Sequence, residues 1–430
     1  MTDSTLLPYL PDLVMHQIIQ RLPTKPAIRM SCLSKQWEGV WSALRILEFD
    51  EGNQPHDDDD DDDDDNHTHA KFLNILARYL EFRQKDKQQP PLDKFRLCMT
   101  YLDADEDAII GKLLSNLFER NVKDLDISLR SKHQKVESYY CLPRTAIINA
   151  KSVTTLNLEH LRIKDIHNIP EPMLPSLKTL SLKTMQVSGP ALFYLILGCT
   201  SVEHLSLTSC SFDPPVFLIS SSSLKSLEVK NCNLQHIRVD EAINLESFIL
   251  VSEFSTLEGV LLDKSFKLSS MKIRDQHLSY FGLSECHDSL EATINTPNLV
   301  HFLFQGSIKS KVSLSAPNLQ IAHILLKKEF STFKGPWQHF DILRDFLEAF
   351  SCSKNITFFI RDFKDIIFPA DFKRTFHPPF PSVEGVKVVI LNPPTKETES
   401  SKLKVSLVWM APSAVEIECD SLSEHRGLNM

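Results

Sequence analysis

The chain has 430 residues, 42% of them hydrophobic, which is enough for two or three domains with a substantial core. Its formal charge of −9 comes from one unbroken aspartate run, residues 57–65, and outside that run acidic and basic residues balance. A global basic field for nucleic-acid binding is therefore excluded. The conspicuous apolar run at residues 191–197 is too short to span a membrane, and nine scattered cysteines without a CxxC pair fit reduced thiols. We expect a soluble protein of the cytoplasm and/or nucleus.

Residues 10–50, after a short tail at 1–9, predict a small helical module. Pro11 and Asp12 suit a helix N-terminus, because a first-turn proline loses no hydrogen bond and an acidic residue favours the positive end of the helix dipole. A module of about 40 residues rarely buries enough surface to fold alone, so it implies a partner. Its apolar side chains recur at the spacing of three short helices, at Val14, Ile18, Leu22, Ile28, Cys32, Leu33, Trp37 and Trp41.

The same segment resembles a plant-type F-box, collinear with it and without a gap. The resemblance rests on Leu10-Pro11-Asp12, Ile18-Ile19, Leu22-Pro23-Thr24-Lys25, Ala27-Ile28-Arg29, Leu33-Ser34-Lys35, Trp37, Trp41 and Leu47-Glu48-Phe49-Asp50. It implies docking on a Skp-type adaptor, and through it on a cullin, within a ubiquitin ligase. We expect the adaptor contact or the core of the module to be formed by Leu10, Pro11, Ile18, Leu22, Leu33, Trp37 and Trp41.

Residues 51–70 contain the aspartate run and predict a disordered acidic linker, because adjacent like charges repel and nothing apolar is present to bury. The flanking His56, His67 and His69 could bind divalent cations weakly together with the aspartates. A solvated spacer is the favoured interpretation, because fixed ligand spacing is lacking.

Residues 71–121 predict a helical cap with a first strand. Helical spacing extends from residue 70 to about 87 and again over 108–120. Between the two, Phe95, Leu97 and Met99 alternate as in a short strand.

Residues 122–391 are repetitive. The spacing of an apolar residue, two others, an apolar residue, one other and an apolar residue occurs nine times, for example at Val153-Leu156-Leu158 and Leu319-Ala322-Ile324. Five successive intervals are 21 to 25 residues, the period of leucine-rich repeats. A tenth occurrence, Val383-Val386-Val388, follows an irregular stretch. The fourth and sixth positions should point inward from a strand.

This body resembles the degenerate leucine-rich repeats that follow the F-box in plant F-box/leucine-rich-repeat proteins, with Pro297-Asn298-Leu299 and Pro317-Asn318-Leu319 as repeat openings. The predicted fold is an α/β leucine-rich-repeat solenoid, with its parallel sheet on the concave face, preceded by a small all-α module. Residues 189–198 predict a helical return between strands, whereas the returns at residues 214–215 and 220–223 should be irregular. Residues 392–430 are a separate C-terminal segment.

The outward strand positions define a candidate substrate face. It combines a basic stripe with apolar groups at positions where solvent favours polar ones. Its members are Lys183, Lys230, Ile249, Val251, Lys272, Arg274, Leu303 and Leu325. The alternative is a solvated stripe beside residues that a neighbouring loop covers.

No catalytic or metal-binding motif stands out, and we expect a chain that is not an enzyme and needs no cofactor or metal. Cys199, Cys210 and Cys232 fall where buried structural thiols are more common than nucleophiles. The resemblance implies a subunit that selects an unidentified protein substrate for ubiquitination. Two alternatives stay open: a receptor whose repeat cavity binds a hormone-like ligand, and an adaptor-bound scaffold without ligase output.

Overall fold

The structure is a computed structural model that forms two compact units, Met1–Val202 and Glu203–Met430, each described here by itself. No helix within the described ranges has both the length and the apolar character needed to cross a bilayer. The described residues are 10–22, 24–30, 37, 44–53, 64–85, 91–102, 104–131, 139–163, 173–253, 256–327 and 337–421.

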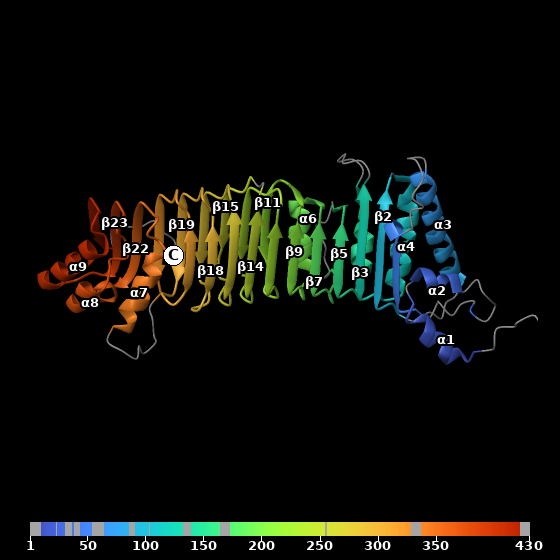
Figure 1. The fold of residues 1–430 in the computed structure, drawn as a ribbon, viewed down its shortest axis with the longest axis horizontal. Coiled ribbons are helices and arrows are strands. Elements are labelled where there is room, and N and C mark those ends of the chain that lie inside the picture. The colour runs from blue at the N-terminus through green and yellow to red at the C-terminus, as the bar shows by residue number, and fades with distance from the viewer. Residues whose placement is uncertain are drawn as a thin grey trace, which may run out of the picture. The chain divides into compact units, whose positions relative to one another are not determined.

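In the N-terminal unit, parallel strands are connected by helical returns (Figure 1). The strands of its larger sheet follow the order β1-β2-β3-β5-β7, and a small sheet contains β4, β6 and β8. The helices are α1 (Asp12–Ile19), α2 (Thr24–Met30), η2 (Glu51–Asn53), α3 (Asp64–Lys85), η3 (Ala104–Glu106), α4 (Asp107–Glu119), α5 (Arg144–Asn149) and α6 (Gly189–Gly198). The strands are β1 (Ile46–Asp50), β2 (Lys94–Tyr101), β3 (Asp124–Ser131), β4 (Tyr140–Cys141), β5 (Thr155–Glu159), β6 (Leu161–Ile163), β7 (Thr179–Lys183) and β8 (Gln186–Ser188).

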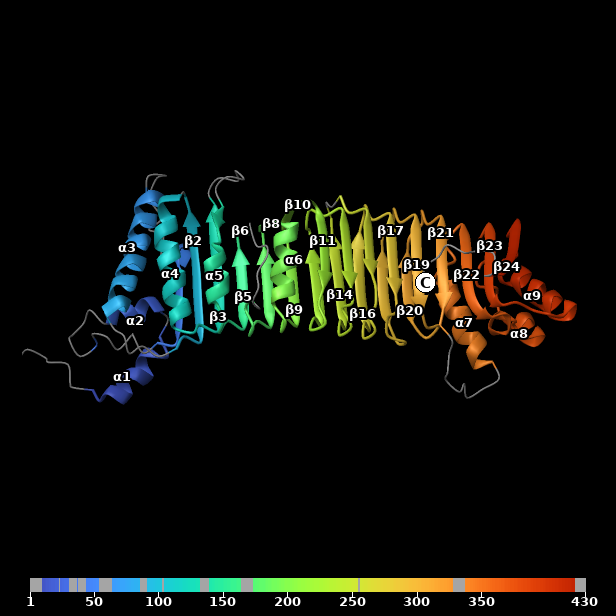
Figure 2. The same ribbon diagram turned by 180° about the vertical axis from the view of Figure 1, so that it is seen from behind.

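In the C-terminal unit, the chain alternates between two parallel sheets (Figure 2). We call β9-β12-β14-β16-β18-β20 the main sheet and β11-β13-β15-β17-β19-β21-β22-β23-β24 the second sheet. The main-sheet strands are β9 (His204–Thr208), β12 (Ser226–Lys230), β14 (Ser247–Ser252), β16 (Ser270–Asp275), β18 (Glu291–Asn295) and β20 (Lys311–Ser315). The second-sheet strands are β11 (Val216–Ser220), β13 (His236–Asp240), β15 (Gly259–Leu262), β17 (Tyr280–Ser284), β19 (His301–Gly306), β21 (Ile321–Leu326), β22 (Asn355–Asp362), β23 (Gly385–Asn392) and β24 (Glu416–Ser421). The short strand β10 (Ser211–Asp213) belongs to neither sheet.

The predicted fold class is confirmed, and the inward positions of the repeat pattern are buried. Leu227 and Val229 of β12 are 0% and 1% exposed, and Phe248 and Leu250 of β14 are 0% and 2% exposed. The predicted helix at residues 189–198 is α6. Inward-facing side chains of neighbouring strands therefore stack into one continuous core.

Residues 214–215 and 221–223 lack regular structure as expected, but the prediction that the returns are irregular is wrong for most of the C-terminal unit. Residues 216–220 form β11, and each later return up to β21 contributes a further strand to the second sheet. The last three pattern matches also lie on the second sheet, on β19, β21 and β23. The two sheets carry the same alternation of buried and exposed residues, and so the spacing alone does not say to which sheet a strand belongs.

The aspartate run does not separate the helical module from the sheet. β1 precedes the run and β2 follows it, yet the two strands pair in parallel, with Ile46 opposite Lys94. Residues 51–53 form η2 and residues 64–70 belong to α3, so neither stretch is part of a disordered linker. Residues 54–63 lie outside the described part of the chain. The run is thus an insertion between two elements of one unit.

The turns that follow several strands contain a residue in the left-handed conformation. His160, Thr184, Ser209 and Asn231 follow β5, β7, β9 and β12 with φ of 60°, 48°, 53° and 49°. The amide of Asn231 also donates to the Val251 carbonyl at 2.8 Å, which adds a bond to the ladder beyond the strand. Side chains other than asparagine therefore occupy this turn position, at a cost of about 1–2 kcal/mol each.

The sheet also continues beyond the boundary at residue 391. β23 reaches Asn392, and β24 pairs with it in parallel, with Gly385 opposite Glu416. The returns around these last strands are helical, as α7 (Gln338–Glu348), η5 (Phe363–Ile366), α8 (Ala370–Thr375) and α9 (Glu397–Met410). The expected separate C-terminal segment is therefore part of the second sheet.

An aromatic cluster attaches α7 to the second sheet. Phe350 follows this helix, is fully buried, and stacks on Phe302 of β19 with ring centroids 5.5 Å apart. Phe302 in turn stacks on Phe281 of β17 at 5.2 Å. The cluster places the helical end of the unit on the hydrophobic core.

We predict that Phe350→Ala lowers the free energy of unfolding by about 3–5 kcal/mol, because it leaves a cavity between α7 and β19. Phe266→Ala is the control, since Phe266 is 47% exposed and its loss should change the stability by less than about 0.5 kcal/mol. Urea denaturation of the full chain measures both. Equal effects of the two substitutions would contradict the packing described.

Candidate functional site

Helix α1 has one buried apolar face and a second apolar face that reaches solvent. Met15 and Ile19 are 2% and 0% exposed, whereas Leu13 is 72% and Val14 is 38% exposed. A short helix with apolar side chains on its solvent side is typical of a surface that binds another protein.

The helical module is bonded directly to the first strand of the sheet. Thr24 begins α2 and is 6% exposed, and its hydroxyl oxygen accepts a 2.7 Å hydrogen bond from the Glu48 amide of β1. Ala27, one turn further along α2, is fully buried. A side chain of the module is therefore hydrogen-bonded to the backbone of the sheet.

The seven residues predicted for the adaptor contact or the core differ in their burial. Trp37 is 5% exposed and belongs to the core. Pro11 is exposed, and Leu10, Ile18 and Leu22 are half-buried on the side open to solvent. Leu33 and Trp41 lie outside the described residues. The prediction omitted Leu13, whose exposure no spacing rule reveals, and the core residues Met15, Ile19 and Ala27.

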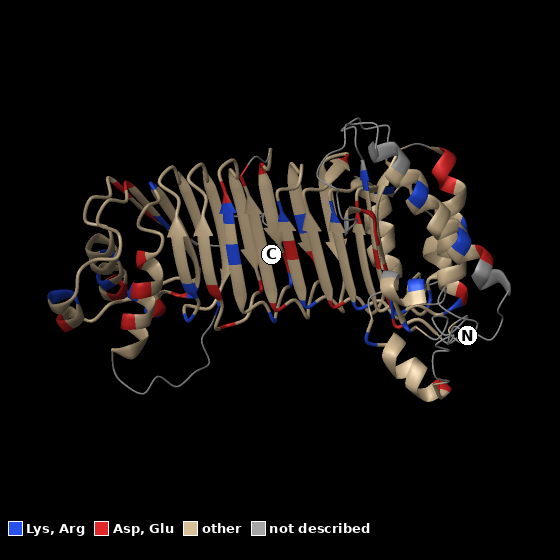
Figure 3. Ribbon diagram, turned by 45° about the vertical axis from the view of Figure 1, so that its right-hand side comes forward, with Lys and Arg blue, Asp and Glu red and all other residues tan. Residues whose placement is uncertain are grey.

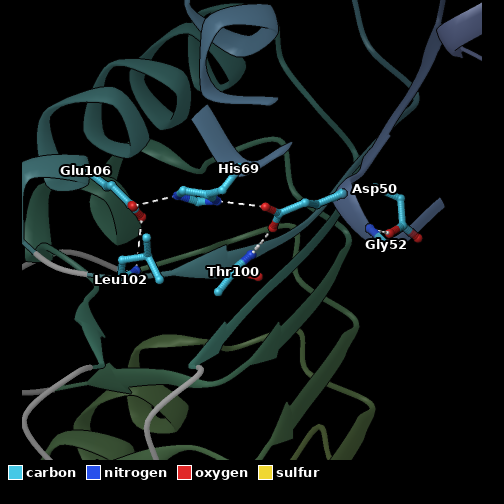
Figure 4. Close-up of polar contacts among 7 residues, drawn as sticks. Asp50, Gly52, His69, Thr100, Leu102 and Glu106 are labelled. Carbon is cyan, nitrogen blue, oxygen red and sulfur yellow. Dashed lines mark hydrogen bonds and ion pairs between the residues drawn. The ribbon is translucent and has the colours of Figure 1, made fainter. Parts of the chain in front are cut away.

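A buried histidine lies between two glutamate carboxylates in the same unit (Figure 4). His69 of α3 contacts Glu51 of η2 through Nδ1 at 2.7 Å and Glu106 of η3 through Nε2 at 2.8 Å. The three side chains are 6%, 12% and 7% exposed. They join segments on both sides of the aspartate insertion.

The carboxylates are also held by backbone amides. The Thr100 amide donates to Glu51 at 2.5 Å, and the Leu102 amide donates to Glu106 at 3.3 Å. Burial lowers the pKa of His69, but the hydrogen bonds to Glu106 and Glu51 outweigh burial, and the pKa lies above its usual value of 6.5. The imidazolium form is therefore favoured between the two carboxylates.

This arrangement is structural in character. Weak cation binding by the histidines that flank the aspartate run would need a ring nitrogen of His69 directed at the cation. Both ring nitrogens contact carboxylates instead. His56 lies outside the described residues. Within the described ranges, no group of three His, Cys, Asp or Glu side chains is placed to hold a metal ion.

The outer face of the main sheet brings five of the eight predicted substrate-face residues together. On neighbouring strands Ile249 lies opposite Lys272, and Val251 lies opposite Arg274. Lys230 is the next residue in the row of Val251, on β12. These five residues define what we call the mixed patch, in which half-buried aliphatic groups lie beside exposed cations.

The cations of the mixed patch differ in whether they are neutralised. Lys230 forms a 2.6 Å ion pair with Glu228, whose hydrogen bond to Lys230 holds the carboxylate pKa below its usual value. Lys272 and Arg274 have no hydrogen bond or ion pair in the described part of the chain. Figure 3 shows how charged residues are distributed over these strands. Two positive charges are thus available at this surface.

The other three residues of the predicted face lie elsewhere. Lys183 is on β7 of the N-terminal unit, in a 2.6 Å ion pair with Glu159. Leu303 and Leu325 are on β19 and β21, so they face outward from the second sheet and not from the main sheet. The single predicted face is therefore wrong for Leu303 and Leu325, because the spacing rule assigned strands of both sheets to one surface. The place of Lys183 in a substrate face stays a prediction.

The cysteines singled out in the sequence are buried. Burial raises the pKa of Cys199 to about 12. A hydrogen bond to Cys210, together with burial, raises the pKa of Cys232. Cys210 donates to the Thr208 carbonyl at 3.5 Å. Raised thiol pKa values disfavour the thiolate that a nucleophile requires.

Comparison with known proteins places these features in a family. Residues 7–49 match the F-box domain family. Residues 110–259 match the leucine-rich repeats of the FBD-associated F-box protein At5g56370, and residues 198–335 match the leucine-rich-repeat domain of At1g61320/AtMIF1. The chain is a plant-type F-box/leucine-rich-repeat protein.

Relatives from Arabidopsis thaliana combine an F-box and leucine-rich repeats in their names. F-box/LRR-repeat protein At3g03360 is 27% identical over 348 residues, covering 76% of this chain and 66% of the relative. F-box/FBD/LRR-repeat protein At2g26030 is 25% identical over 349 residues, covering 81% and 65%. F-box/LRR-repeat protein At3g26922 is 25% identical over 265 residues, covering 60% and 78%. The chain spans slightly less than two thirds of the first two relatives.

The buried triad predicts a pH dependence of stability. Because the folded pKa of His69 is raised above 6.5, its stabilising effect is complete below pH 6.5 and is lost as the pH rises through the folded value. We expect the wild-type melting temperature to fall on that alkaline side. His69→Asn should be less stable at acidic pH and should show a flatter profile.

The exposed His204 provides the matched control, because His204→Asn should retain the wild-type profile. Thermal melts followed by circular dichroism at half-unit pH steps give the comparison. A His69→Asn profile parallel to that of the wild type would contradict the assignment.

Proposed function

We propose that the chain is the substrate-recognition subunit of a Skp/cullin/F-box ubiquitin ligase. An F-box domain in general binds a Skp-type adaptor and through it a cullin, and the F-box/leucine-rich-repeat family is generally a non-enzymatic adaptor family. The observation that carries the proposal is the apolar solvent side of α1, where Leu13 is 72% exposed. Covering this side with an adaptor would remove the apolar surface from water.

The adaptor would bind the solvent side of α1 and leave the buried side intact. Leu13 and Val14 would supply the largest change in exposed apolar area, and the half-buried Leu10, Ile18 and Leu22 would complete the contact. Met15 and Ile19 would keep the helix on the rest of the module. This division separates adaptor binding from folding.

The mixed patch would hold the protein substrate. Lys272 and Arg274 supply unneutralised charge, and Ile249 and Val251 supply aliphatic surface on the adjacent strand. Interfaces gain orientation and association rate from complementary charge and gain affinity from desolvated apolar contacts. A substrate with acidic residues near an apolar side chain fits this surface.

The mechanism is proximity and includes no bond chemistry on this chain. The ligase complex brings its conjugating enzyme, and the repeats bring the substrate. Holding both in one assembly raises the effective concentration of a substrate lysine at the reactive centre.

We predict that the double substitution Leu13→Glu and Val14→Glu abolishes co-elution with a Skp-type adaptor in size-exclusion chromatography, because it places two charges in an apolar contact. Val405→Glu combined with Val408→Glu is the control, since it places the same two charges at exposed apolar positions of α9, 58% and 56% exposed, and should leave binding within about twofold of the wild type. The melting temperature of each variant confirms folding. Failure of the wild-type chain to bind any such adaptor would refute the proposal.

We predict that Lys272→Glu combined with Arg274→Glu lowers substrate recovery in proximity labelling, performed with the proteasome inhibited, while adaptor binding is unchanged. Lys267→Glu combined with Lys402→Glu gives the same change in net charge at exposed positions outside the patch and should label substrates as the wild type does.

A chain lacking residues 10–50 shows which of the labelled proteins depend on the ligase. Labelling that is identical for both double variants would rule out the mixed patch as the substrate site. Repeating the capture after exhaustive dialysis tests the receptor alternative, because capture that needs a small ligand would then be lost.

A further inference from the structure

The main sheet has an open edge at β20. The next strand along the chain, β21, belongs to the second sheet, and α7 follows it. Among the described residues, no strand pairs with the side of β20 that faces away from β18. An unpaired strand edge is a template for a further strand.

The hydrogen bonds to β18 show which peptide groups of β20 are free. The Lys311 amide donates to the Leu290 carbonyl at 2.7 Å, and the Ser315 carbonyl accepts from the Thr296 amide at 3.0 Å. In a parallel ladder, alternate residues direct both peptide groups to the same neighbouring strand. The peptide groups of Val312 and Leu314 therefore point away from β18, where the described residues offer them no partner.

The side chains at this edge are also incompletely covered. Val312 and Leu314 are only half-buried, whereas Ala292 and Ile294, their register partners on β18, are 3% and 1% exposed. A cavity of about 680 Å³ lies here, within the range of about 300–1,000 Å³ usual for ligand sites. Figure 2 labels β20 and α7, which both line it. Its apolar lining is formed by Ala292, Ile308, Val312, Ile342 and Phe346.

A buried hydroxyl without a partner lines the same cavity. Ser310 is 3% exposed, its amide donates to the Ser307 carbonyl at 3.2 Å, and its Oγ has no hydrogen bond. Buried hydroxyls are nearly always satisfied, and leaving one unpaired costs about 1–3 kcal/mol. The cavity thus contains a polar group that a ligand can satisfy.

We propose that the β20 edge binds an extended segment of a partner protein, which adds to the main sheet as a further parallel strand. Its backbone would bond with the free peptide groups of Val312 and Leu314. Its side chains would alternate, so that the one beside Val312 enters the cavity against Ile342 of α7 and the one beside Leu314 covers that half-buried side chain. Strand addition of this kind takes affinity from main-chain bonds and specificity from alternate side chains.

Charge complementarity specifies the class of segment. Lys311 pairs with Glu291 on the β18 side at 2.8 Å, and its other side faces the position beside the open edge. Lys309 also lines the cavity. The cavity lining also contains one acidic side chain of α7, the exposed Asp345, but Arg344 neutralises it in an ion pair. An acidic residue beside Lys311 therefore continues the observed Glu291–Lys311 row.

β18 itself illustrates the required sequence. Its residues Glu291, Ala292, Thr293, Ile294 and Asn295 pair in parallel with β20. A segment with the same order of residues on the open side of β20 would place its acidic residue beside Lys311. Its apolar residues would lie beside Val312 and Leu314, and its polar residues beside Ser313 and Ser315. The segment we propose is therefore an acidic, strand-forming peptide with apolar residues at alternate positions. This site is separate from the mixed patch, and the proposal does not depend on ligase activity.

The test is fluorescence polarisation of the full chain with a labelled peptide that contains the sequence Glu-Val-Thr-Ile-Asn between Gly-Ser flanks. We expect saturable binding that Val312→Pro weakens by at least about tenfold, because proline removes the free edge amide and is tolerated in edge strands. Lys311→Glu should weaken this peptide and favour a peptide with lysine in place of glutamate. Ser310→Ala should weaken binding by a smaller factor.

A matched pair of peptides tests the register without altering the protein. The threonine amide is predicted to donate to the Val312 carbonyl, whereas the isoleucine amide points away from β20. N-methylation of the threonine should therefore weaken binding by at least about tenfold, and N-methylation of the isoleucine should weaken it much less.

Three results would overturn the proposal. One is the absence of saturable binding to the wild-type chain at millimolar peptide. Another is equal binding of the two N-methylated peptides, which keeps the test valid even if Val312→Pro fails to fold. The third is loss of binding in the Lys272→Glu and Arg274→Glu variant with normal binding in Val312→Pro, which would move the peptide to the mixed patch.

Discussion

The structure depends on the burial of paired apolar side chains between successive parallel strands. Leu227 and Val229 of β12 have apolar register partners on both sides, from β9 and from β14, and each buried side chain of this size contributes about 1.5–3 kcal/mol. One coil of the chain cannot bury its apolar face alone. The turns, the second sheet and the helices at the end of the C-terminal unit all serve to continue or to close this core.

The inward positions could be predicted from the sequence because strand periodicity and burial are local properties. The spacing alone predicts that Leu158, Ala322 and Ile324 point inward, and all three are at most 2% exposed. The assignment of strands to sheets could not be predicted in the same way. β19 and β16 show the same alternation, and only the path of the chain between them determines that they belong to different sheets.

The candidate sites show the same limit. Spacing predicted an apolar stripe through Val14, Ile18 and Leu22, but it could not tell that the stripe faces solvent while Met15 and Ile19 form the core. The His69 triad was missed because its three members are brought together by pairing between β1 and β2, which are separated by the aspartate insertion. Non-local strand pairing leaves no periodic signal in the sequence.

The hydrogen bond between Thr24 and the Glu48 amide links adaptor binding to the orientation of the first strands. A helical module on a flexible tether could bind an adaptor without orienting any strand. Because Thr24 of α2 is bonded to β1, and β1 pairs with β2, an adaptor that binds the module would also hold these two strands in a fixed orientation. The proposed adaptor contact would therefore orient the N-terminal unit as well as anchor it.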